Sequence, residues 1–247
     1  MTAELQPHDE LTLLAHRYRS DKGSSYSFAH GYTRIYQAML EPVRHAPLRI
    51  AEIGLVLDHV QTAEPAAVAN KECSSLHMWA EYLPAARLFG FDRVDFRHFA
   101  SERIMIAQGD QGERADLRRF AENAGGRFDL IIDDGSHASH HQQIALATLF
   151  PYLADGGLYV IEDLHYQPPH LEIAGIATTR QFLFSLVTRQ TGLRLALQQS
   201  EFGYLLDNIE HLHFFDSLSP HYPRHVTADA LAVLKKRGHH AYFNFAF

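Results

Sequence analysis

The chain of 247 residues has little cysteine and no long apolar segment. Cys73 is its only cysteine, so no disulfide can form within the chain. The apolar stretch LATLFPYLADGGLYVI is interrupted by Pro, Asp and Gly well before the roughly 20 residues that a membrane-spanning helix needs. The opening MTAELQPHDE lacks the basic and apolar regions of a secretory signal. We therefore expect a cytoplasmic protein that does not enter a membrane.

Positive charge is also scarce and scattered. The sequence has 22 Lys and Arg residues against 29 Asp and Glu, which gives a formal net charge of −7. Such a chain offers no basic patch for a nucleic-acid backbone or an anionic membrane surface. Its 46% hydrophobic content is enough for one large core. We expect a single domain over residues 1–247, with no nucleic acid or membrane as partner.

The two common phosphate-binding motifs are missing. Neither G-x-G-x-x-G nor G-x-x-x-x-G-K-[ST] occurs in the sequence. These motifs let backbone N–H groups approach the phosphates of dinucleotides and of ATP. Nicotinamide dinucleotides and ATP are therefore disfavoured as ligands.

From Leu48 onward, short apolar runs alternate with helical patterns. The runs are LRIAEIG, ARLFGFD, RIMIAQGD, FDLIIDDG and GLYVIEDL, and the helical patterns between them are SSLHMWAEYL, RADLRRFAENAGG and HHQQIALATLFPYLADG. This alternation is typical of parallel βαβ units in a doubly wound α/β sheet. Later in the chain, the aromatic alternation in EFGYLLDNIEHLHFFDSL and HAYFNFAF suggests strands that complete the sheet. The segment before Leu48 indicates two helices around a polar SDKGSS turn, which either pack on the sheet or cover its edge as a lid.

Polar residues gather where the expected strands end. They are Glu52, Gly54, Asp92, Gly109, Asp110, Asp133, Asp134, Glu162 and Asp163. Ligands of such sheets bind beyond the carboxyl ends of the strands, near the point where the strand order reverses. We therefore expect these residues to line one edge of the sheet.

The first three strand ends suggest a site for an adenosine-containing cofactor. Glu52 can accept hydrogen bonds from an ammonium or hydroxyl group, and Gly54 lets a ligand approach the backbone. Asp92 stands where doubly wound folds bind a ribose diol. Asp110 and Gln111, in QGDQ, could bind a purine ring and its exocyclic amine.

The last two strand ends suggest a metal and a base. Asp134 and His137 follow one strand closely, and Glu162 and Asp163 end the next. Three carboxylates in one pocket repel each other unless a cation is present, and oxygen ligands favour Mg²⁺. A histidine beside the ion could act as a general base. The alternative is that the acids of DDGSH only cap a turn and that its histidines lie in solvent. The second acidic motif, IEDL, disfavours this alternative.

Taken together, these motifs resemble a known family. SDKGS…YTRIY, AEIG, SSLHMWAEYLPAARLFGFD, QGDQ, FDLIIDDGSHASHHQ and PYLADGGLYVIEDL are similar to class I S-adenosylmethionine-dependent methyltransferases, specifically the Mg-dependent sugar O-methyltransferases of macrolide and saccharide biosynthesis. The resemblance covers about Tyr18 to Leu164. It implies a Rossmann-like, mostly parallel seven-stranded sheet over residues 48–247 with a helical extension over residues 1–47.

The resemblance also implies roles for individual residues. S-adenosylmethionine and Mg²⁺ would be the cofactors, with Asp134, Glu162 and Asp163 as metal ligands and His137 as the base. The acceptor would be a hydroxyl of a sugar or small glycoside. Asp133 would contact the cofactor or its own turn.

One segment departs from the family pattern. LVLDHVQTAEPAAVANKECSS follows Gly54 where the family has a short glycine-rich loop, and it contains no glycine. Ser75, at the start of the next helix, could still offer its backbone and hydroxyl to the amino-acid end of the cofactor. GFDRVDF is similar to members that act on glucosylglycerate-like glycosides.

Three alternative functions stay open on the sequence. A catechol-type O-methyltransferase would use a similar metal and aromatic clamps, for which Tyr26, Tyr32 and Tyr36 are candidates. A non-catalytic metal- or saccharide-binding module would not need His137, and a metal-dependent hydrolase would not need S-adenosylmethionine. A dimer or larger homo-oligomer is plausible because the N-terminal segment could cover a neighbouring site.

Overall fold

A computed structural model describes residues 9–26, 29–55, 73–216 and 230–243. Within these residues no helix is both long and apolar enough to cross a membrane. Residues 56–72, the larger part of the glycine-free segment after Gly54, lie outside the described residues.

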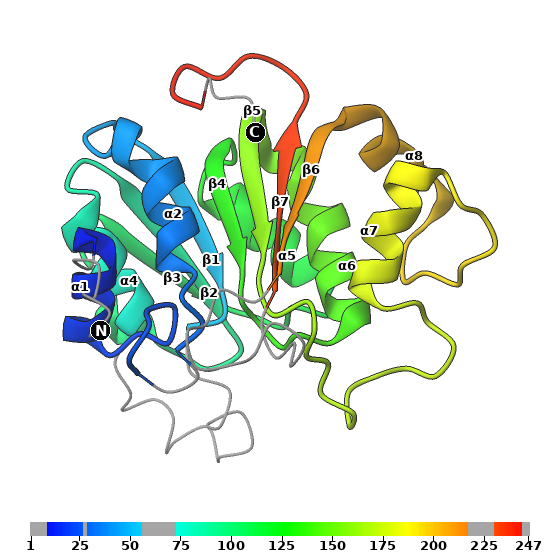
Figure 1. The fold of residues 1–247 in the computed structure, drawn as a ribbon, viewed down its shortest axis with the longest axis horizontal. Coiled ribbons are helices and arrows are strands. Elements are labelled where there is room, and N and C mark those ends of the chain that lie inside the picture. The colour runs from blue at the N-terminus through cyan, green and yellow to red at the C-terminus, as the bar shows by residue number, and fades with distance from the viewer. Residues whose placement is uncertain (1–8, 27–28, 56–72, 217–229, 244–247) are drawn as a thin grey trace, which may run out of the picture.

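The core is one seven-stranded sheet in the order β3-β2-β1-β4-β5-β7-β6 (Figure 1). Its strands are β1 (Arg49–Ile53), β2 (Arg87–Asp92), β3 (Ile104–Gln108), β4 (Phe128–Asp133), β5 (Leu153–Ile161), β6 (Ile209–Phe215) and β7 (Leu231–Lys236). The first five strands are parallel to one another, and β7 is antiparallel to both β5 and β6. The predicted Rossmann-like, mostly parallel seven-stranded sheet is confirmed.

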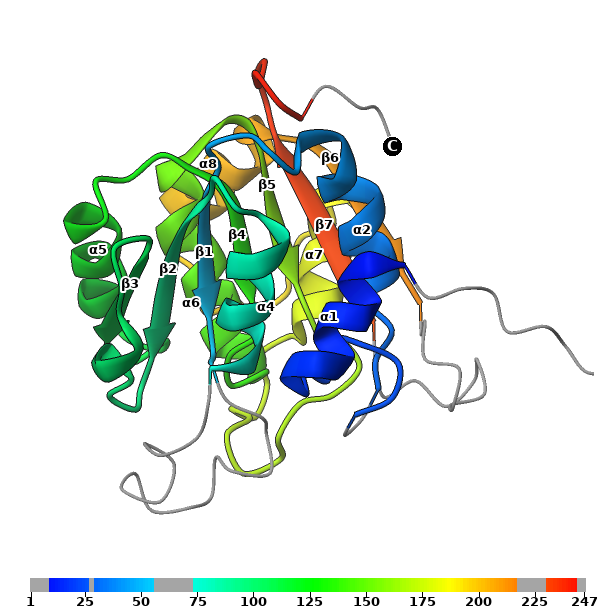
Figure 2. The same cartoon turned by 90° about the vertical axis from the view of Figure 1, so that its left-hand side faces the viewer.

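Helices cover both faces of the sheet (Figure 2). One face carries α1 (Glu10–Tyr18), α2 (Thr33–Leu40) and α4 (Ser74–Tyr82), and the other carries α5 (Arg114–Asn123), α6 (Ser139–Leu149), α7 (Thr179–Thr188) and α8 (Gln199–Asn208). Short 3-10 turns are η1 (Glu41–Val43), η3 (Arg97–Phe99) and η4 (Phe150–Tyr152). Because both faces are buried, the strands are continuous apolar runs rather than alternating ones.

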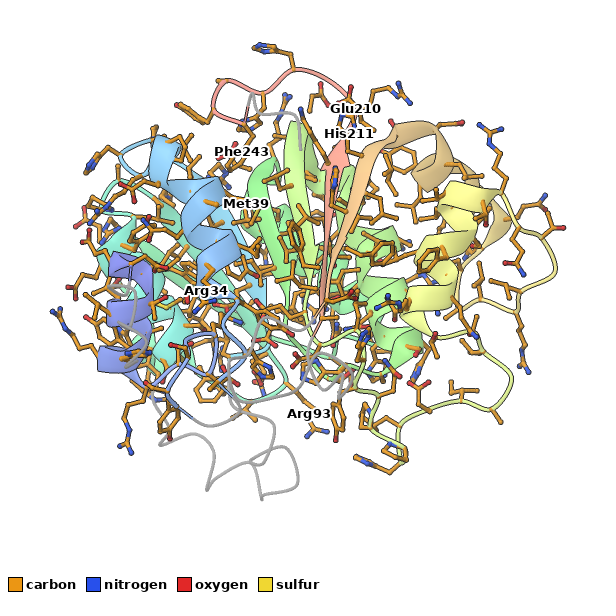
Figure 3. The ribbon with its side chains drawn as sticks, viewed as in Figure 1. Arg34, Met39, Arg93, Glu210, His211 and Phe243 are labelled. Atoms are coloured by element: carbon orange, nitrogen blue, oxygen red, sulfur yellow. The ribbon has the colours of Figure 1, made fainter. Side chains whose placement is uncertain are left out.

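The strand order reverses between β1 and β4. These strands pair in parallel, with Ile53 opposite Asp133 at their carboxyl ends. The neighbouring strands β2, β3 and β5 end at the same edge of the sheet, where Figure 3 labels Arg93, whereas Phe243 lies near the opposite edge. The edge with the carboxyl ends is called the rim below, and the candidate site lies on it.

The C-terminal third corrects two expectations. EFGYLLDN belongs to α8, with the strand starting only at Ile209, and the strand between β5 and β6 is LAVLKK rather than HAYFNFAF. The backbone N–H groups of Tyr242 and Phe243 donate to Nδ1 of His240, so they are not available for a strand ladder. Nε2 of the same ring lies 2.9 Å from Oδ1 of Asp129. Residues 244–247, the end of the expected strand, lie outside the described residues.

Candidate active site

Gly54 brings the ends of β1 and β4 into contact. Its φ is +83°, and a Cβ built on it would lie 1.9 Å from the carbonyl oxygen of Asp134. The backbone N–H of Asp134 donates to the carbonyl oxygen of Ile53 at 2.9 Å. On the side where a Cβ would stand, the backbone after β4 packs directly against this glycine, and the expected approach of a ligand to its backbone stays a prediction. Gly54 thereby sets the position of the turn that carries Asp134.

Three of the predicted site residues converge on the rim. Asp134, His137 and Asp163 each offer a ligand atom, and these atoms lie within 4.8 Å of one another. His137 and Asp163 both have left-handed backbone, with φ of 58° and 54°. Non-glycine residues seldom adopt this conformation, and those that do are concentrated at functional sites. Two acids and an imidazole can therefore face one small volume.

Glu162 does not belong to this group of three. Its Oε1 accepts a hydrogen bond from the hydroxyl of Tyr36, and its Oε2 accepts one from Nζ of Lys22 at 2.9 Å. The arrangement differs from the expected one, in which three carboxylates surrounded the ion and the histidine stood beside them. In the described residues, His137 stands with two carboxylates and the third is held by a lysine and a tyrosine.

Lys22 is the main residue that sequence reasoning missed. Its side chain is 1% exposed, and Nζ contacts Asp134 and Glu162 and lies 3.4 Å from Oε1 of Glu52. Burial alone would lower the pKa of Lys22, but the three carboxylates together raise it well above its ordinary value. The SDKGS motif, which contains Lys22, could have indicated this residue because it is one of the motifs shared with the family. Its composition alone indicates only a polar turn.

The loop between α1 and α2 is built to hold Lys22 over the rim. The backbone N–H of Thr33 donates to the carbonyl oxygen of Lys22 at 3.0 Å, and that of Gly31 donates to Gly23 at 2.8 Å. A Cβ on Gly23 would lie 2.9 Å from Cβ of Ala15, so the loop packs closely against α1. The helices on either side pack on the sheet, and this loop brings Lys22 to the rim. Packing on the sheet is one of the two arrangements expected for the segment, and a role as a lid stays a prediction.

Tyr32 and His30, from the same loop, approach Asp163. The hydroxyl of Tyr32 donates to Oδ1 of Asp163 at 2.6 Å, and Nδ1 of His30 lies 3.6 Å from that oxygen. The rings of His30 and Tyr32 are stacked, with centroids 5.0 Å apart. Burial would raise the pKa of Asp163, but attraction to His30 and His137 and the Tyr32 hydrogen bond bring it below its ordinary value. The Asp163 carboxylate is thus held in the ionised form that a metal ion needs.

On the cofactor side of the rim, Glu52 is buried and paired. Ser75, at the start of α4, donates from its hydroxyl to Oε2 of Glu52 at 2.9 Å. Burial raises the pKa of Glu52 to about 7, although Lys22 and Ser75 oppose the shift. Two residues predicted for the cofactor's amino-acid end are therefore in contact, next to Lys22.

Asp92 holds the backbone at the end of β2. Its Oδ2 accepts from the N–H of Leu55 and its Oδ1 from the N–H of Val94, both at 2.8 Å. Burial raises the pKa of Asp92 above its ordinary value, and these backbone hydrogen bonds oppose the shift. Asp92 lies at the strand end where the sequence predicted it, partly exposed beside Leu55.

Asp133 and Gln111 bond to each other inside the protein. Nε2 of Gln111 donates to Oδ1 of Asp133 at 2.6 Å, and Oε1 accepts from the N–H of Ser136 at 2.9 Å. Burial raises the pKa of Asp133 to about 7. Asp110 is more open, and its Oδ1 accepts from the N–H of Gly112 at 2.7 Å. Gln111 thus connects the loop after β3 to the turn that carries Asp134 and His137.

The chain is similar to known methyltransferases. No family model matches the chain. It is 34% identical, over 96% of its length and 53% of the relative's, to the 8-demethyl-8-(2-methoxy-alpha-L-rhamnosyl)-tetracenomycin-C 3'-O-methyltransferase of Streptomyces olivaceus. It is 35% identical, over 63% of its length and 36% of the relative's, to the mycinamicin VI 2''-O-methyltransferase of Micromonospora griseorubida.

A solved structure is also similar. It is the MycE methyltransferase from the mycinamycin biosynthetic pathway in complex with Mg, SAH and mycinamycin VI, with a TM-score of 0.70 and 28% identity over 96% of this chain and 58% of that chain. The chain spans about half the length of the first of these curated relatives and about a third of the second. By sequence and fold it belongs to the class I S-adenosylmethionine-dependent methyltransferases and is a relative of the sugar O-methyltransferases of macrolide and tetracenomycin pathways.

Proposed function

We propose that this chain transfers a methyl group from S-adenosylmethionine to a hydroxyl of a sugar or small glycoside in an Mg²⁺-dependent reaction. One observation carries the proposal: Asp134, His137 and Asp163 converge on the rim of a methyltransferase fold. The relatives that methylate sugars are longer proteins, so their activity is proposed here for the part they share with this chain.

The residues present fit a magnesium ion. Carboxylate oxygens are the ligands that hard divalent cations prefer, and a buried carboxylate held in its ionised form is ready to bind one. Asp134 and Asp163 supply such oxygens within 4.8 Å of a His137 nitrogen, and Glu162 lies next to Asp163 in sequence. We propose Asp134 and Asp163 as ligands, with Glu162 completing the set. Bound Mg²⁺ would orient the acceptor oxygen and lower the pKa of its hydroxyl.

His137 is proposed as the general base. Its Nε2 lies 3.7 Å from Oδ2 of Asp163, and its Nδ1 is buried without a hydrogen-bond partner in the part of the chain that is described. The imidazole takes the hydroxyl proton as the acceptor oxygen forms its bond to the methyl carbon and the bond from that carbon to sulfur breaks. The carboxylate of Asp163 then stabilises the imidazolium, and uncharged S-adenosylhomocysteine leaves.

The cofactor is proposed to lie along the ends of β1, β2 and β3. Ser75 and Glu52 would face its amino-acid end, Asp92 its ribose, and Asp110 its adenine. Gln111 and Asp133 would also shape the turns around this site, because they hydrogen-bond to each other, and Gly54 would do so because the backbone of Asp134 packs against it.

A saccharide is favoured over an aromatic diol as the acceptor. Tyr32 and Tyr36 are fully buried, and their hydroxyls donate to Asp163 and Glu162. They are therefore not free to clamp a substrate ring, and of the three tyrosines suggested for a catechol-type enzyme only Tyr26, half-buried beneath the Arg19 guanidinium, stays a candidate. The absence of nucleic-acid and membrane partners and the possible homo-oligomer stay predictions.

Calorimetric titration would test the cofactor and the metal. S-adenosylmethionine and S-adenosylhomocysteine are titrated into the protein with Mg²⁺ and with chelator, and Mg²⁺ is titrated separately. We expect both nucleosides to bind, and Asp134→Ala to abolish Mg²⁺ binding. Asp95→Ala is the matched control, because Asp95 pairs with Arg97 away from the three converging residues. If neither nucleoside binds under any of these conditions, the proposal is wrong.

A second variant tests the role of His137. If His137 is the general base, His137→Ala should lower turnover by roughly 10²-fold or more while Mg²⁺ still binds. His211→Ala is the control, since His211 is exposed on the edge strand β6 (Figure 3). Loss of Mg²⁺ binding in His137→Ala would instead make His137 a ligand. Unchanged turnover would show that His137 is not the base, and no turnover in the unmodified chain would favour a non-catalytic module.

A further inference from the structure

The ammonium group of Lys22 lies among the ends of three strands. Its Nζ contacts Glu52 at the end of β1, Asp134 after β4, and Glu162 after β5. Lys22 is separated by 112 residues from Asp134 and by 140 from Glu162. A single ion pair needs only one carboxylate. An ammonium shared by three is coordinated as a metal ion would be.

Asp134 belongs to two cationic positions at once. Its Oδ2 contacts Nζ of Lys22, and the same carboxylate is one of the three groups that converge with His137 and Asp163. In enzymes with two metal ions, a carboxylate commonly lies between ions that are about 3.5–4 Å apart. Asp134 has the position of such a bridging carboxylate, with an ammonium on one side.

The acids at the rim favour a second cation. Glu52, Glu162 and Asp163 are buried and Asp134 is partly exposed, so four acids crowd one small region. Ionised carboxylates in such a region repel each other, and a lysine supplies a positive charge that is covalently held in the chain, unlike a bound ion. The close packing of Gly23 against α1 and the hydrogen bond from Thr33 to the Lys22 carbonyl hold this lysine in position.

We propose that Lys22 is a resident cation of the metal centre, whose ammonium occupies the position of a second divalent ion and limits the centre to one ion. The inference rests on the proposed function for the first ion, but not on turnover. It also gives the loop between α1 and α2 a positioning role, because that loop delivers a charge on which the carboxylates depend.

The test counts Mn²⁺ ions bound to the whole chain by electron paramagnetic resonance. Mn²⁺ is used because it takes the same oxygen ligands as Mg²⁺ and its spectrum reports both free ions and coupled pairs. Lys22→Ala removes the ammonium and leaves room for an ion. We expect it to bind one Mn²⁺ more than the unmodified chain, with the spectrum of a coupled pair. Lys22→Arg keeps the charge and should bind the same number as the unmodified chain.

A count in Lys22→Ala equal to that of the unmodified chain would overturn the proposal. If Lys22→Ala does not fold, Lys22→Met decides, since it keeps most of the side-chain volume and removes only the charge. We expect its first Mn²⁺ to bind at least tenfold more tightly, because a neighbouring positive charge is gone. An affinity within threefold of the unmodified chain would be evidence against a resident cation.

A different result would contradict the proposed function. If the unmodified chain binds no Mn²⁺ that Asp134→Ala removes, the first ion is absent and the methyltransferase mechanism loses its metal. In that case one Mn²⁺ bound by Lys22→Ala and none by the unmodified chain would still support the role of Lys22, and no Mn²⁺ in either would overturn it.

Discussion

The hydroxyl of Tyr32 donates a hydrogen bond to Oδ1 of Asp163 at 2.6 Å, across 131 residues of sequence. Together with Lys22, it connects the N-terminal loop to the ends of β4 and β5. The strands supply the carboxylates and the loop supplies the groups that neutralise and orient them. The N-terminal segment thus contributes side chains to the candidate site.

Tyr32→Phe should weaken this arrangement without removing a ligand. A buried hydrogen bond to a charged group contributes about 1.5–3 kcal/mol, so we expect a loss of that size in the free energy of unfolding. The affinity for Mg²⁺ should fall several-fold, because Asp163 loses a group that holds its orientation. Tyr18→Phe is the control, since the Tyr18 hydroxyl bonds to Glu81 at the surface and should change stability by less than about 0.5 kcal/mol. Equal effects in the two variants would contradict the role given to Tyr32.

Gln111→Ala distinguishes a positioning residue from a cofactor ligand. The substitution removes the hydrogen bonds to Asp133 and to the N–H of Ser136, which fix the turn before His137. We expect kcat to fall about tenfold while the Kd for S-adenosylmethionine changes less than threefold. Gln108→Ala, at the exposed end of β3, should change neither value. A rise in Kd with unchanged kcat would show instead that Gln111 binds the cofactor directly.

Gly54→Ala should be among the most damaging single substitutions. The added methyl group would overlap the carbonyl oxygen of Asp134, and the φ of +83° is unfavourable for alanine. We expect a loss of more than about 3 kcal/mol in the free energy of unfolding, or no folded protein. Gly203→Ala is the contrast, because Gly203 lies within α8 and a Cβ there would meet nothing within 4 Å. That change should stabilise the protein by roughly 0.5–1 kcal/mol, measured by urea unfolding.

Cys73 should make the protein less stable at alkaline pH. Burial, with smaller contributions from Asp92 and Glu52, raises the pKa of its thiol to about 12. In the unfolded chain the thiol ionises near pH 8.5, so its contribution is complete below that pH and is lost as the pH rises toward 12. The slope should approach about 1.4 kcal/mol per pH unit, and the difference between the unmodified chain and Cys73→Ala measures it. Parallel stability curves for the two proteins between pH 8 and pH 10 would contradict the prediction.

Local sequence patterns were sufficient to predict the parallel half of the fold and its rim. The central strands β1, β2, β4 and β5 are largely buried on both faces, so each is an apolar run followed by polar residues, and this pattern is visible without tertiary information. Asp134, His137 and Asp163 follow from the same rule, because parallel strands bring their carboxyl ends to one edge.

The antiparallel strands were harder to predict from local sequence patterns. The aromatic alternation of HAYFNFAF suggested a strand, while the shorter run LAVLKK forms β7. What decides between them is the position between β5 and β6, which buries both faces of Leu231–Lys236. The ring of His240, by contrast, takes up the backbone donors of Tyr242 and Phe243. The pairing of β7 with its two neighbours is not local in sequence, and neither is the contact of the His240 ring with Asp129, 111 residues away.

The sequence by itself determined the fold class, the rim and the acidic residues on it, because strand periodicity and strand-end chemistry are properties of short segments. Only the tertiary structure decided what those acids contact. Lys22 stands in a polar turn and, taken alone, would be expected to lie in solvent. Folding buries it between Glu52, Asp134 and Glu162, because α1 and α2 pack on the sheet and carry their connecting loop to the rim.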